Sequence, residues 1–359
     1  MMKPNTAALL DAVALPGSSR TLGSEKAVRR LNETADHIEI ALQFDFPANH
    51  LSADIERNIR AALAAAGEQR PLVLTQESRI AVHKVRPGVK TLSGVKNMIA
   101  VASGKGGVGK STTTANLAAA MNALGARVGV LDADLYGPSQ PAMLGVAGAK
   151  PEQRNGRFIP VRTAEGIQVM SMGFLVEHNQ AVVWRGPMIS QALQQLLFQT
   201  DWDDIDYLFI DLPPGTGDIQ LTLAQKIPVT GAVVVTTPQD IALIDARKAV
   251  DMFAKVQIPI FGILENMSLH ICTRCGHREA VFGSGGGTEM AQQLGVPLLG
   301  QLPLSLPVRE AMDRGEAAKL QQNYPDIAAV YRDAAFQTAL AAADKGRDYS
   351  SAFPNIVVE

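Results

Sequence analysis

The sequence contains only two cysteines among 359 residues, and they stand three positions apart. A pair this close in so long a chain excludes a disulfide framework, so we interpret Cys272 and Cys275 as residues with a chemical role. A surplus of positive charge is also absent, because 33 lysines and arginines are balanced by 35 aspartates and glutamates. This balance gives no indication of a nucleic-acid partner.

Long apolar runs are missing as well. No stretch approaches the roughly 18 uninterrupted apolar residues that a membrane-spanning helix needs. The opening residues contain no long apolar segment after their single lysine. We therefore expect a cytoplasmic protein without a membrane partner. Its length and composition suit a globular protein with one large α/β domain and a smaller one.

The order of apolar segments predicts these two parts. A strand with alternating apolar residues at 37–46 and a helix at 51–67 indicate a small N-terminal α/β domain. The segment rich in lysine, glycine and proline that follows is typical of a linker. The expected boundaries are 1–82 for the small domain, 83–97 for the linker, 98–345 for the main domain and 346–359 for a C-terminal tail.

The main domain alternates short apolar runs with helical segments. Examples of the runs are 98–103, 207–214 and 232–238. Continuous apolar strands separated by helices predict a mostly parallel sheet covered by helices on both faces. Ligands of such sheets bind beyond the carboxyl ends of the strands.

The stretch "GKGGVGKS" at 104–111 has the spacing of a phosphate-binding loop, and a strand and a helix flank it. Glycines allow consecutive backbone N–H groups to approach phosphate oxygens, and the helix adds its positive end. Lys110 is expected to reach the β and γ phosphates, and the Ser111 hydroxyl to bind Mg²⁺. The predicted nucleotide contacts are Gly104, Lys105, Gly106, Gly107, Val108, Gly109, Lys110, Ser111 and Thr112.

Aspartates follow two other predicted strands. Asp211, in "LFIDLPPGTGD", stands where a Walker B carboxylate that supports Mg²⁺ belongs, and the N–H of Gly215 is a candidate donor to the γ phosphate. Asp132 and Asp134, in "VLDADLYGP", are candidates for orienting the attacking water. We choose Asp134 for the catalytic role, together with Lys105 and Lys110.

Lys105 supports a resemblance to a known family. "KGGVGKS" resembles the deviant Walker A motif of the MinD, ParA and nitrogenase-iron-protein ATPases. In those proteins the early lysine reaches across a dimer to the nucleotide of the partner. The resemblance implies a P-loop NTPase fold, an ATPase activity and a homodimer in which two chains face each other.

The segment around the cysteines narrows the resemblance. "ENMSLHICTRCGHREAVFGSGGG" at 265–287, with "LDADLYGPS", "DLPPGTGD" and "GVPLLGQLPL", resembles the Mrp/ApbC iron–sulfur cluster carriers over about residues 95–340. The resemblance implies ATP as nucleotide, an adenine contact by Asn266, and a [4Fe–4S] cluster bridging two subunits through Cys272 and Cys275. Recipient apoproteins would be the partners.

The small domain resembles the MIP18 type, which many Mrp-like proteins carry at their N-terminus. The strand, loop and helix at 37–63 carry this likeness. The cysteine common in that loop is replaced by "FPANHLS", so the resemblance implies no cluster ligand in this domain.

Alternative functions remain open at this point. His270 and His277 flank the cysteine pair and offer a single-chain zinc site, and the pair alone also suits a structural or thioredoxin-like redox role. A positioning ATPase of the MinD/ParA kind would need a basic amphipathic C-terminal helix, whereas this end of the chain is alanine-rich and of mixed charge. A reductase resembling the nitrogenase iron protein would not arrange its cluster ligands as a close Cys-x-x-Cys pair.

Overall fold

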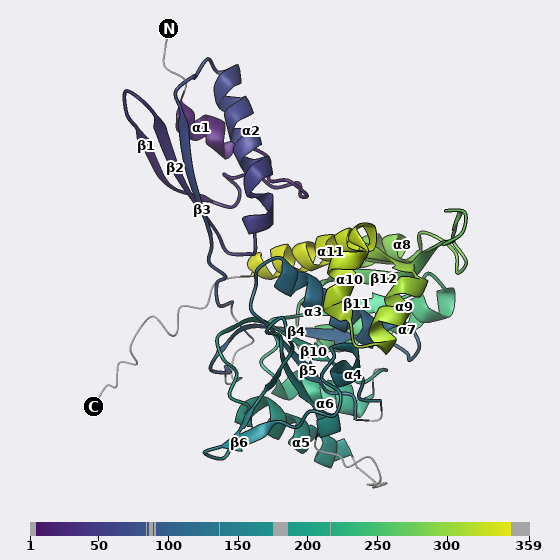
Figure 1. The fold of residues 1–359 in the computed structure, drawn as a ribbon. Helices are drawn as coiled ribbons and strands as arrows, with labels where there is room; N and C mark the ends of the chain where they lie inside the picture. The colour runs from purple at the N-terminus through teal and green to yellow at the C-terminus, as the bar shows by residue number, and fades with distance from the viewer. Residues whose placement is uncertain are drawn as a thin grey trace. The chain divides into compact units, whose positions relative to one another are not determined.

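The computed structural model describes residues 5–83, 85, 89, 91–135, 137–174, 186–215 and 217–345 (Figure 1). The chain divides into two compact units, Met1–Ala81 and Val82–Glu359. The tail expected at 346–359 and parts of the expected linker lie outside the described residues.

The N-terminal unit is built on a three-stranded sheet of order β1-β2-β3. Strands β1 and β2 are antiparallel, and β3 is parallel to β2. Helix α2 buries Ile55, Ile59 and Leu63, which lie one turn apart on a single face. The elements are α1 (Thr6–Asp11), β1 (Val28–Glu33), β2 (Ile38–Phe44), η1 (Asn49–Leu51), α2 (Ser52–Ala65) and β3 (Leu72–Ser78). This confirms the predicted small α/β domain.

The larger unit contains a sheet of nine strands among the described residues. Its order is β13-β12-β11-β4-β10-β5-β9-β8, and β14 also pairs with β12. Only the short β13 and β8 are antiparallel to their neighbours in this described sheet. The strands are β4 (Val95–Ala102), β5 (Val128–Asp132), β8 (Val161–Arg162), β9 (Gln168–Ser171), β10 (Ile205–Asp211), β11 (Gly231–Thr236), β12 (Ile260–Ile271), β13 (Arg278–Glu279) and β14 (Leu298–Leu304).

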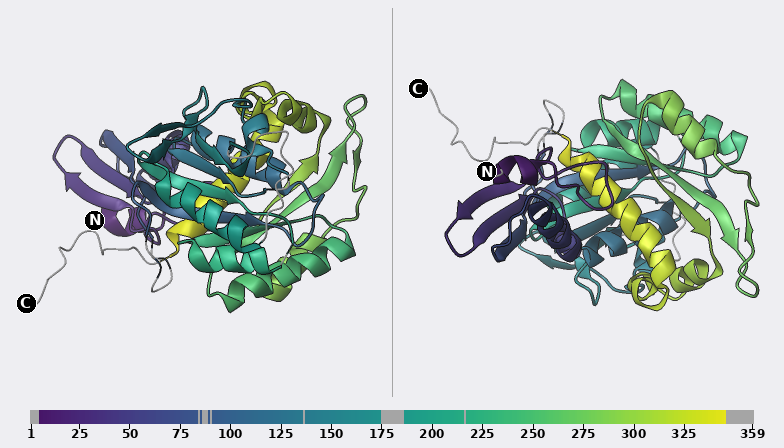
Figure 2. Two further views of the ribbon diagram at one scale, coloured as in Figure 1. Left: turned by 90° about the horizontal axis from the view of Figure 1, so that it is seen from below. Right: turned by 90° about the horizontal axis from the view of Figure 1, so that it is seen from above.

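Helices cover both faces of this sheet, as predicted. Figure 2 shows α11, in yellow, crossing one face, and the teal and green helices α5, α6 and α7 on the other. The alanines of α3 allow it to pack closely between the sheet and α11. The helices are α3 (Lys110–Ala123), α4 (Gln140–Met143), α5 (Gly186–Gln199), α6 (Asp218–Lys226), α7 (Asp240–Lys255), α8 (Gly286–Leu294), α9 (Leu306–Asp313), α10 (Ala317–Asn323) and α11 (Pro325–Ala343). None of the described helices is long and apolar enough to cross a membrane.

The central strands are buried along their whole length, which is why they read as continuous apolar runs. Every residue of β5, β10 and β11 is buried. All three strands are parallel to their neighbours in the sheet. Their carboxyl ends therefore meet at one edge, where the aspartates of β5 and β10 lie side by side.

Strand β4 begins at Val95, so the last three residues of the segment expected to be a linker belong to the sheet. The polar side chains of Lys96 and Asn97 concealed the start of the strand. Lys96 Nζ lies 2.8 Å from a carboxylate oxygen of Asp206, and the Asn97 amide donates to the Asp206 carbonyl at 3.3 Å.

A small hairpin of β6 (Glu152–Arg154) and β7 (Arg157–Ile159), and the 3-10 turn η2 (Met172–Phe174), were also not expected from the sequence.

Candidate nucleotide and metal-ligand site

The phosphate loop joins β4 to α3 and depends on glycine at two positions for different reasons. A Cβ on Gly104 would lie 2.1 Å from the carbonyl carbon of Asp245 in α7, so only glycine fits this close approach. Gly109 has a φ of +80° directly before α3, and its Cβ would lie 2.3 Å from the side-chain nitrogen of Asn266. The two ends of the loop therefore pack closely against α7 and β12, whereas Gly106 and Gly107 in its middle have no neighbour on their Cβ side.

A cavity of about 270 Å³ lies over this loop. Cβ atoms added to Gly106 and Gly107 would meet nothing within 4 Å, so the backbone here is open to a bound group. This cradle fits the phosphates of a nucleotide. The lining residues are Ser103, Lys105, Gly106, Gly107, Gly109, Lys110, Ser111, Thr112, Asp134, Ser139, Met143 and Pro214.

Lys110 forms a buried ion pair with Asp211, the last residue of β10. Its Nζ also lies 3.3 Å from the Ser111 hydroxyl. The pair joins two residues 101 positions apart in the chain, and it places the expected Mg²⁺ carboxylate directly beside the lysine and hydroxyl of the loop. The local residues therefore fit a bound Mg²⁺ that neighbours a phosphate.

Asp132 does not line the phosphate cavity but organises the chain that follows β5. One carboxylate oxygen accepts from the backbone N–H groups of Ser139 and Gln140 at 2.9 and 3.0 Å and from the Ser171 hydroxyl at 3.2 Å. The other accepts from the N–H of Asp134 at 3.2 Å. Asp134 itself lines the cavity, so the choice of Asp134 over Asp132 remains consistent with the geometry.

Burial, followed by the charge of Asp211, raises the pKa of Asp132 to about 7. Its ordinary pKa, 3.8, applies to the unfolded chain. Between these values the folded protein keeps a proton that the unfolded chain has released. This group therefore stabilises the fold most at acidic pH, and its contribution decreases as the pH rises towards 7.

We expect this decrease to be visible in a comparison of the wild type with Asp132→Asn, measured without nucleotide. The difference in unfolding free energy, wild type minus variant, should fall by about 2 kcal/mol between pH 5 and pH 7 and then level off. Urea unfolding at several pH values provides the measurement. A difference that grows over the same range would contradict the raised pKa.

Asn266 lies on the other side of the loop. Its side-chain amide donates to the carbonyl of Val108 at 2.9 Å. The sequence placed Asn266 after the end of a strand, whereas β12 continues to Ile271. The strand is irregular here, because Met267 has a φ of +58° and the pairing with β14 shifts between Glu265 and Leu269.

A second cavity of about 270 Å³ opens beside Asn266. It shares Gly109, Thr112 and Met143 with the phosphate cavity, so the two adjoin. This arrangement offers a place for a nucleotide base next to the phosphates. The other lining residues are Asn266, Met267, Pro303, Leu304, Ser305, Val308, Arg309, Met312, Asp313 and Tyr331.

Gly215 and Lys105, the two remaining predicted nucleotide contacts, differ in their bonding within the protein. The N–H of Gly215 donates to the carbonyl of Ser103 at 3.0 Å, so it is bonded within the protein rather than directed at the cavity. Lys105 lines the cavity and is partly exposed. Its side chain makes no hydrogen bond or ion pair with the part of the chain that the structure describes.

The cysteine pair lies in the turn of a hairpin formed by β12 and β13. The N–H of Cys272 donates to the carbonyl of His277 at 2.9 Å, and the N–H of Gly276 donates to the carbonyl of Cys272 at 2.9 Å. Cys275 is exposed and Cys272 partly so. A thioredoxin-like pair would begin a helix, so this turn contradicts that alternative.

The turn favours the thiolate form that binds metals. Backbone N–H groups of Arg274 and Cys275 point at the sulfur of Cys272 and lower the pKa of its thiol. No group of three or more histidine, cysteine or acidic side chains that could hold a metal gathers within the described residues. His270 and His277 are therefore not brought together with the cysteines as a single-chain zinc site requires.

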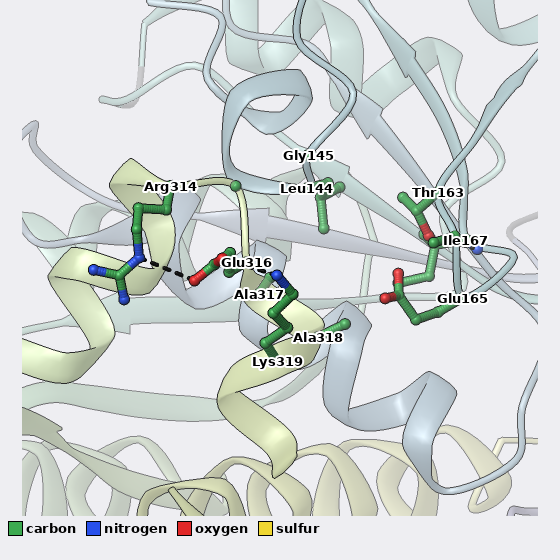
Figure 3. A pocket seen from close by; sticks show the side chains of 12 residues that line it. Leu144, Gly145, Thr163, Glu165, Ile167, Arg314, Glu316, Ala317, Ala318 and Lys319 are labelled. Atoms are coloured by element: carbon green, nitrogen blue, oxygen red, sulfur yellow. Dashed lines mark hydrogen bonds and ion pairs between the residues drawn. The ribbon is translucent and has the colours of Figure 1, made fainter. Parts of the chain in front are cut away.

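A third cavity, of about 260 Å³, lies apart from these sites (Figure 3). Figure 3 shows Arg314 and Lys319 on one side and Glu165 on the other. Both cations are bonded to Glu316 at 2.9 Å. This cavity shares no lining residue with the phosphate cavity, and no sequence motif pointed to it.

Comparison with known proteins identifies the family. A family model described as the NUBPL iron-transfer P-loop NTPase, under the heading ParA, matches residues 94–339. The chain belongs to this family. The matched residues contain the phosphate loop, both aspartate segments, Asn266 and the cysteine hairpin, so the family resemblance stated from the sequence is confirmed.

Individual members of the family are similar over most of their length. An iron-sulfur cluster carrier protein of Pseudomonas fragi is 57% identical over 258 residues, which cover 71% of this chain and 90% of the relative. A protein of the same name from Escherichia coli K12 is 46% identical over 324 residues, covering 90% and 88%. The iron-sulfur cluster transfer protein NUBPL of Mus musculus is 48% identical over 247 residues, covering 68% and 77%.

Solved structures agree with the fold. A nucleotide-binding protein of Archaeoglobus fulgidus in complex with ADP is 37% identical, with a TM-score of 0.57 over 63% of this chain and 89% of that chain. The cell division ATPase MinD of Pyrococcus furiosus, at 23% identity, has a TM-score of 0.51 over 67% of this chain and 97% of that chain. The predicted P-loop NTPase fold is therefore confirmed.

Proposed function

We propose that this chain is a Mg²⁺-dependent ATPase that carries an iron–sulfur cluster and transfers it to recipient apoproteins. The observation that carries this proposal is the course of β12. The middle of this strand holds Asn266 against the phosphate loop, and its carboxyl end leads into the turn that carries Cys272 and Cys275. The names of the relatives support the cluster-carrier role, and the ADP complex of the Archaeoglobus protein supports nucleotide binding.

On the nucleotide side, the residues of the loop have distinct tasks. Backbone N–H groups of the loop hold the phosphates, Lys110 moves from Asp211 to the β and γ phosphates, and Asp134 orients the attacking water. Ser111 and Asp211 hold Mg²⁺, which neutralises phosphate charge during hydrolysis. The Asn266 amide donates to Val108, which leaves its oxygen as an acceptor for the amino group of adenine.

On the cluster side, one chain supplies only half of a ligand set. A [4Fe–4S] cluster is held by four thiolates, and each chain exposes two. Two copies related by a twofold axis therefore complete the site, with the cluster as cargo between them. In the same dimer Lys105, which lines the phosphate cavity and is partly exposed, extends towards the nucleotide of the partner.

We assign the activity to residues 98–345 and treat 1–82 as a separate MIP18-like domain with no cluster ligand. The two thiols suit a reducing compartment, so we place the protein in the cytoplasm. Asn266 and Cys272 are six residues apart along β12 and the turn that follows it, a separation of at most about 20 Å for an extended chain. A change in how the nucleotide is held can therefore shift the cysteine turn.

The test is anaerobic reconstitution with iron and sulfide, followed by counting iron, sulfide and zinc per dimer. We expect about four irons and four sulfides per dimer, as one [4Fe–4S] cluster requires, and transfer to an apo-acceptor whose rate changes with Mg-ATP. Zinc in place of iron would support the zinc-binding alternative. A loaded protein that retains its cluster in the presence of every apo-acceptor would contradict the carrier function.

A further inference from the structure

Gln140 is a fully buried amide at the start of α4 that no sequence motif indicated. Its side-chain nitrogen donates to a carboxylate oxygen of Asp211 at 2.9 Å and to the carbonyl of Ser111 at 2.9 Å. Its backbone N–H donates to Asp132 at 3.0 Å. This one residue therefore connects the ends of β5 and β10 with the first turn of α3.

The surroundings of Asp211 show why this connection matters. Its carboxylate is completely buried and is held by Lys110 and, at 3.2 Å, by the Thr114 hydroxyl on one oxygen, and by Gln140 on the other. Asp132 is a second buried carboxylate close enough for its pKa to respond to the charge of Asp211. Buried carboxylates require donors to stay ionised.

Nucleotide binding changes the set of donors around the Asp211 carboxylate. When Lys110 turns to the phosphates, Asp211 loses its cation and keeps the neutral amide donor of Gln140. The single proton of the Thr114 hydroxyl is shared between Asp211 and the carbonyl of Lys110, which lies closer, at 3.0 Å. The Gln140 amide then holds the Asp211 carboxylate in place and, through the Ser111 carbonyl, keeps the hydroxyl-bearing residue of the loop at a set distance from it. Asp211 and Ser111 are the two residues that we propose as Mg²⁺ ligands.

We propose that Gln140 is a positioning residue for the Mg²⁺ of the bound nucleotide, acting through Asp211 and Ser111. This inference rests on the proposed Mg-ATP site. Stability alone does not explain the residue well, because its side-chain oxygen is buried without a partner among the described residues. A buried amide that is only half satisfied is unfavourable unless its donor side has a task.

The experiment compares Gln140→Met, which keeps the side-chain length without the amide, with the wild type. Equilibrium affinity for a fluorescent ATP analogue is measured in MgCl₂ and in EDTA. We expect the gain in affinity from Mg²⁺ to shrink about tenfold, as for loss of a hydrogen bond to a charged group. Affinity in EDTA should stay within about twofold of the wild type.

Hydrolysis gives a second readout. The Mg²⁺ concentration for half-maximal turnover should rise about tenfold in Gln140→Met, while turnover at saturating Mg²⁺ returns towards the wild-type rate. A role confined to folding would not separate these two quantities. If Gln140→Met does not fold, Gln140→Asn withdraws the amide by one methylene and is expected to give the same shift.

Gln168 provides a matched control. It is also a buried glutamine, and it bonds the backbone of Asp203 through both side-chain atoms, at 2.8 and 3.0 Å, outside the site. Gln168→Met should lower the unfolding temperature and leave the Mg²⁺ dependence unchanged. A Gln140→Met protein with the wild-type Mg²⁺ dependence overturns the positioning role. A wild type that does not respond to Mg²⁺ overturns the magnesium assignment itself, and this inference with it.

Discussion

Replacing Lys110 with alanine is expected to lower ATP turnover by about 10³-fold or more, because a preorganised cation at the transferring phosphate stabilises the negative charge of the transition state strongly. The same change leaves Asp211 buried without its cation. Breaking a buried pair in this way costs about 3–5 kcal/mol of stability. Turnover should therefore be measured alongside thermal unfolding, at a temperature where the variant is folded.

Two further variants separate catalysis from folding. Lys110→Ala combined with Asp211→Asn removes both charges and should recover part of the stability while remaining inactive. Lys105→Ala alters a partly exposed side chain that forms no hydrogen bond or ion pair within the described residues, so the fold and nucleotide affinity should be retained while hydrolysis is lost. Wild-type turnover by Lys105→Ala would remove its proposed role across the dimer.

The second large effect is expected at the cysteine turn. Replacing Cys272 with serine should abolish stable cluster binding and transfer, because a hydroxyl is a poor substitute for a soft thiolate ligand of iron. The turn is exposed and lies beyond the nucleotide cavities, so ATP affinity of the cluster-free variant should equal that of the wild type. Absorbance after anaerobic reconstitution and equilibrium nucleotide binding measure the two properties.

The flanking histidines provide the matched control for this prediction. His277→Ala changes a side chain in the same turn and should leave the cluster intact. Normal cluster retention by Cys272→Ser would contradict the ligand assignment. Loss of metal in His277→Ala, with zinc bound by the wild type, would favour the single-chain zinc site instead.

Coupling between the two sites can be tested on the wild type. If ATP changes the affinity for the cluster, the cluster must change the affinity for ATP by the same factor. Identical ATP affinities of the cluster-free and cluster-loaded dimers would show that β12 transmits no equilibrium coupling.

The sequence alone predicted the features that depend on neighbouring residues. The spacing of glycines, Lys110 and Ser111 defines a phosphate loop locally, since a short loop between a strand and a helix leaves few ways to arrange its N–H groups. The apolar runs predicted the parallel sheet because strands buried on both faces need apolar side chains at every position. The polar start of β4 was missed because Lys96 and Asn97 find their partners on another strand.

Contacts between residues far apart in the sequence became visible only in the folded chain. From the residues alone we predicted a phosphate-binding loop and a chemical role for the two cysteines. The sequence carried no signal that Lys110 pairs with Asp211, that Asp132 binds the backbone of the loop after β5, or that Gln140 joins these residues. These contacts join β5, β10, α3 and α4. They depend on the pairing of β5 with β10, which places Asp132 beside Asp211, and on the return of the chain to this edge at α4.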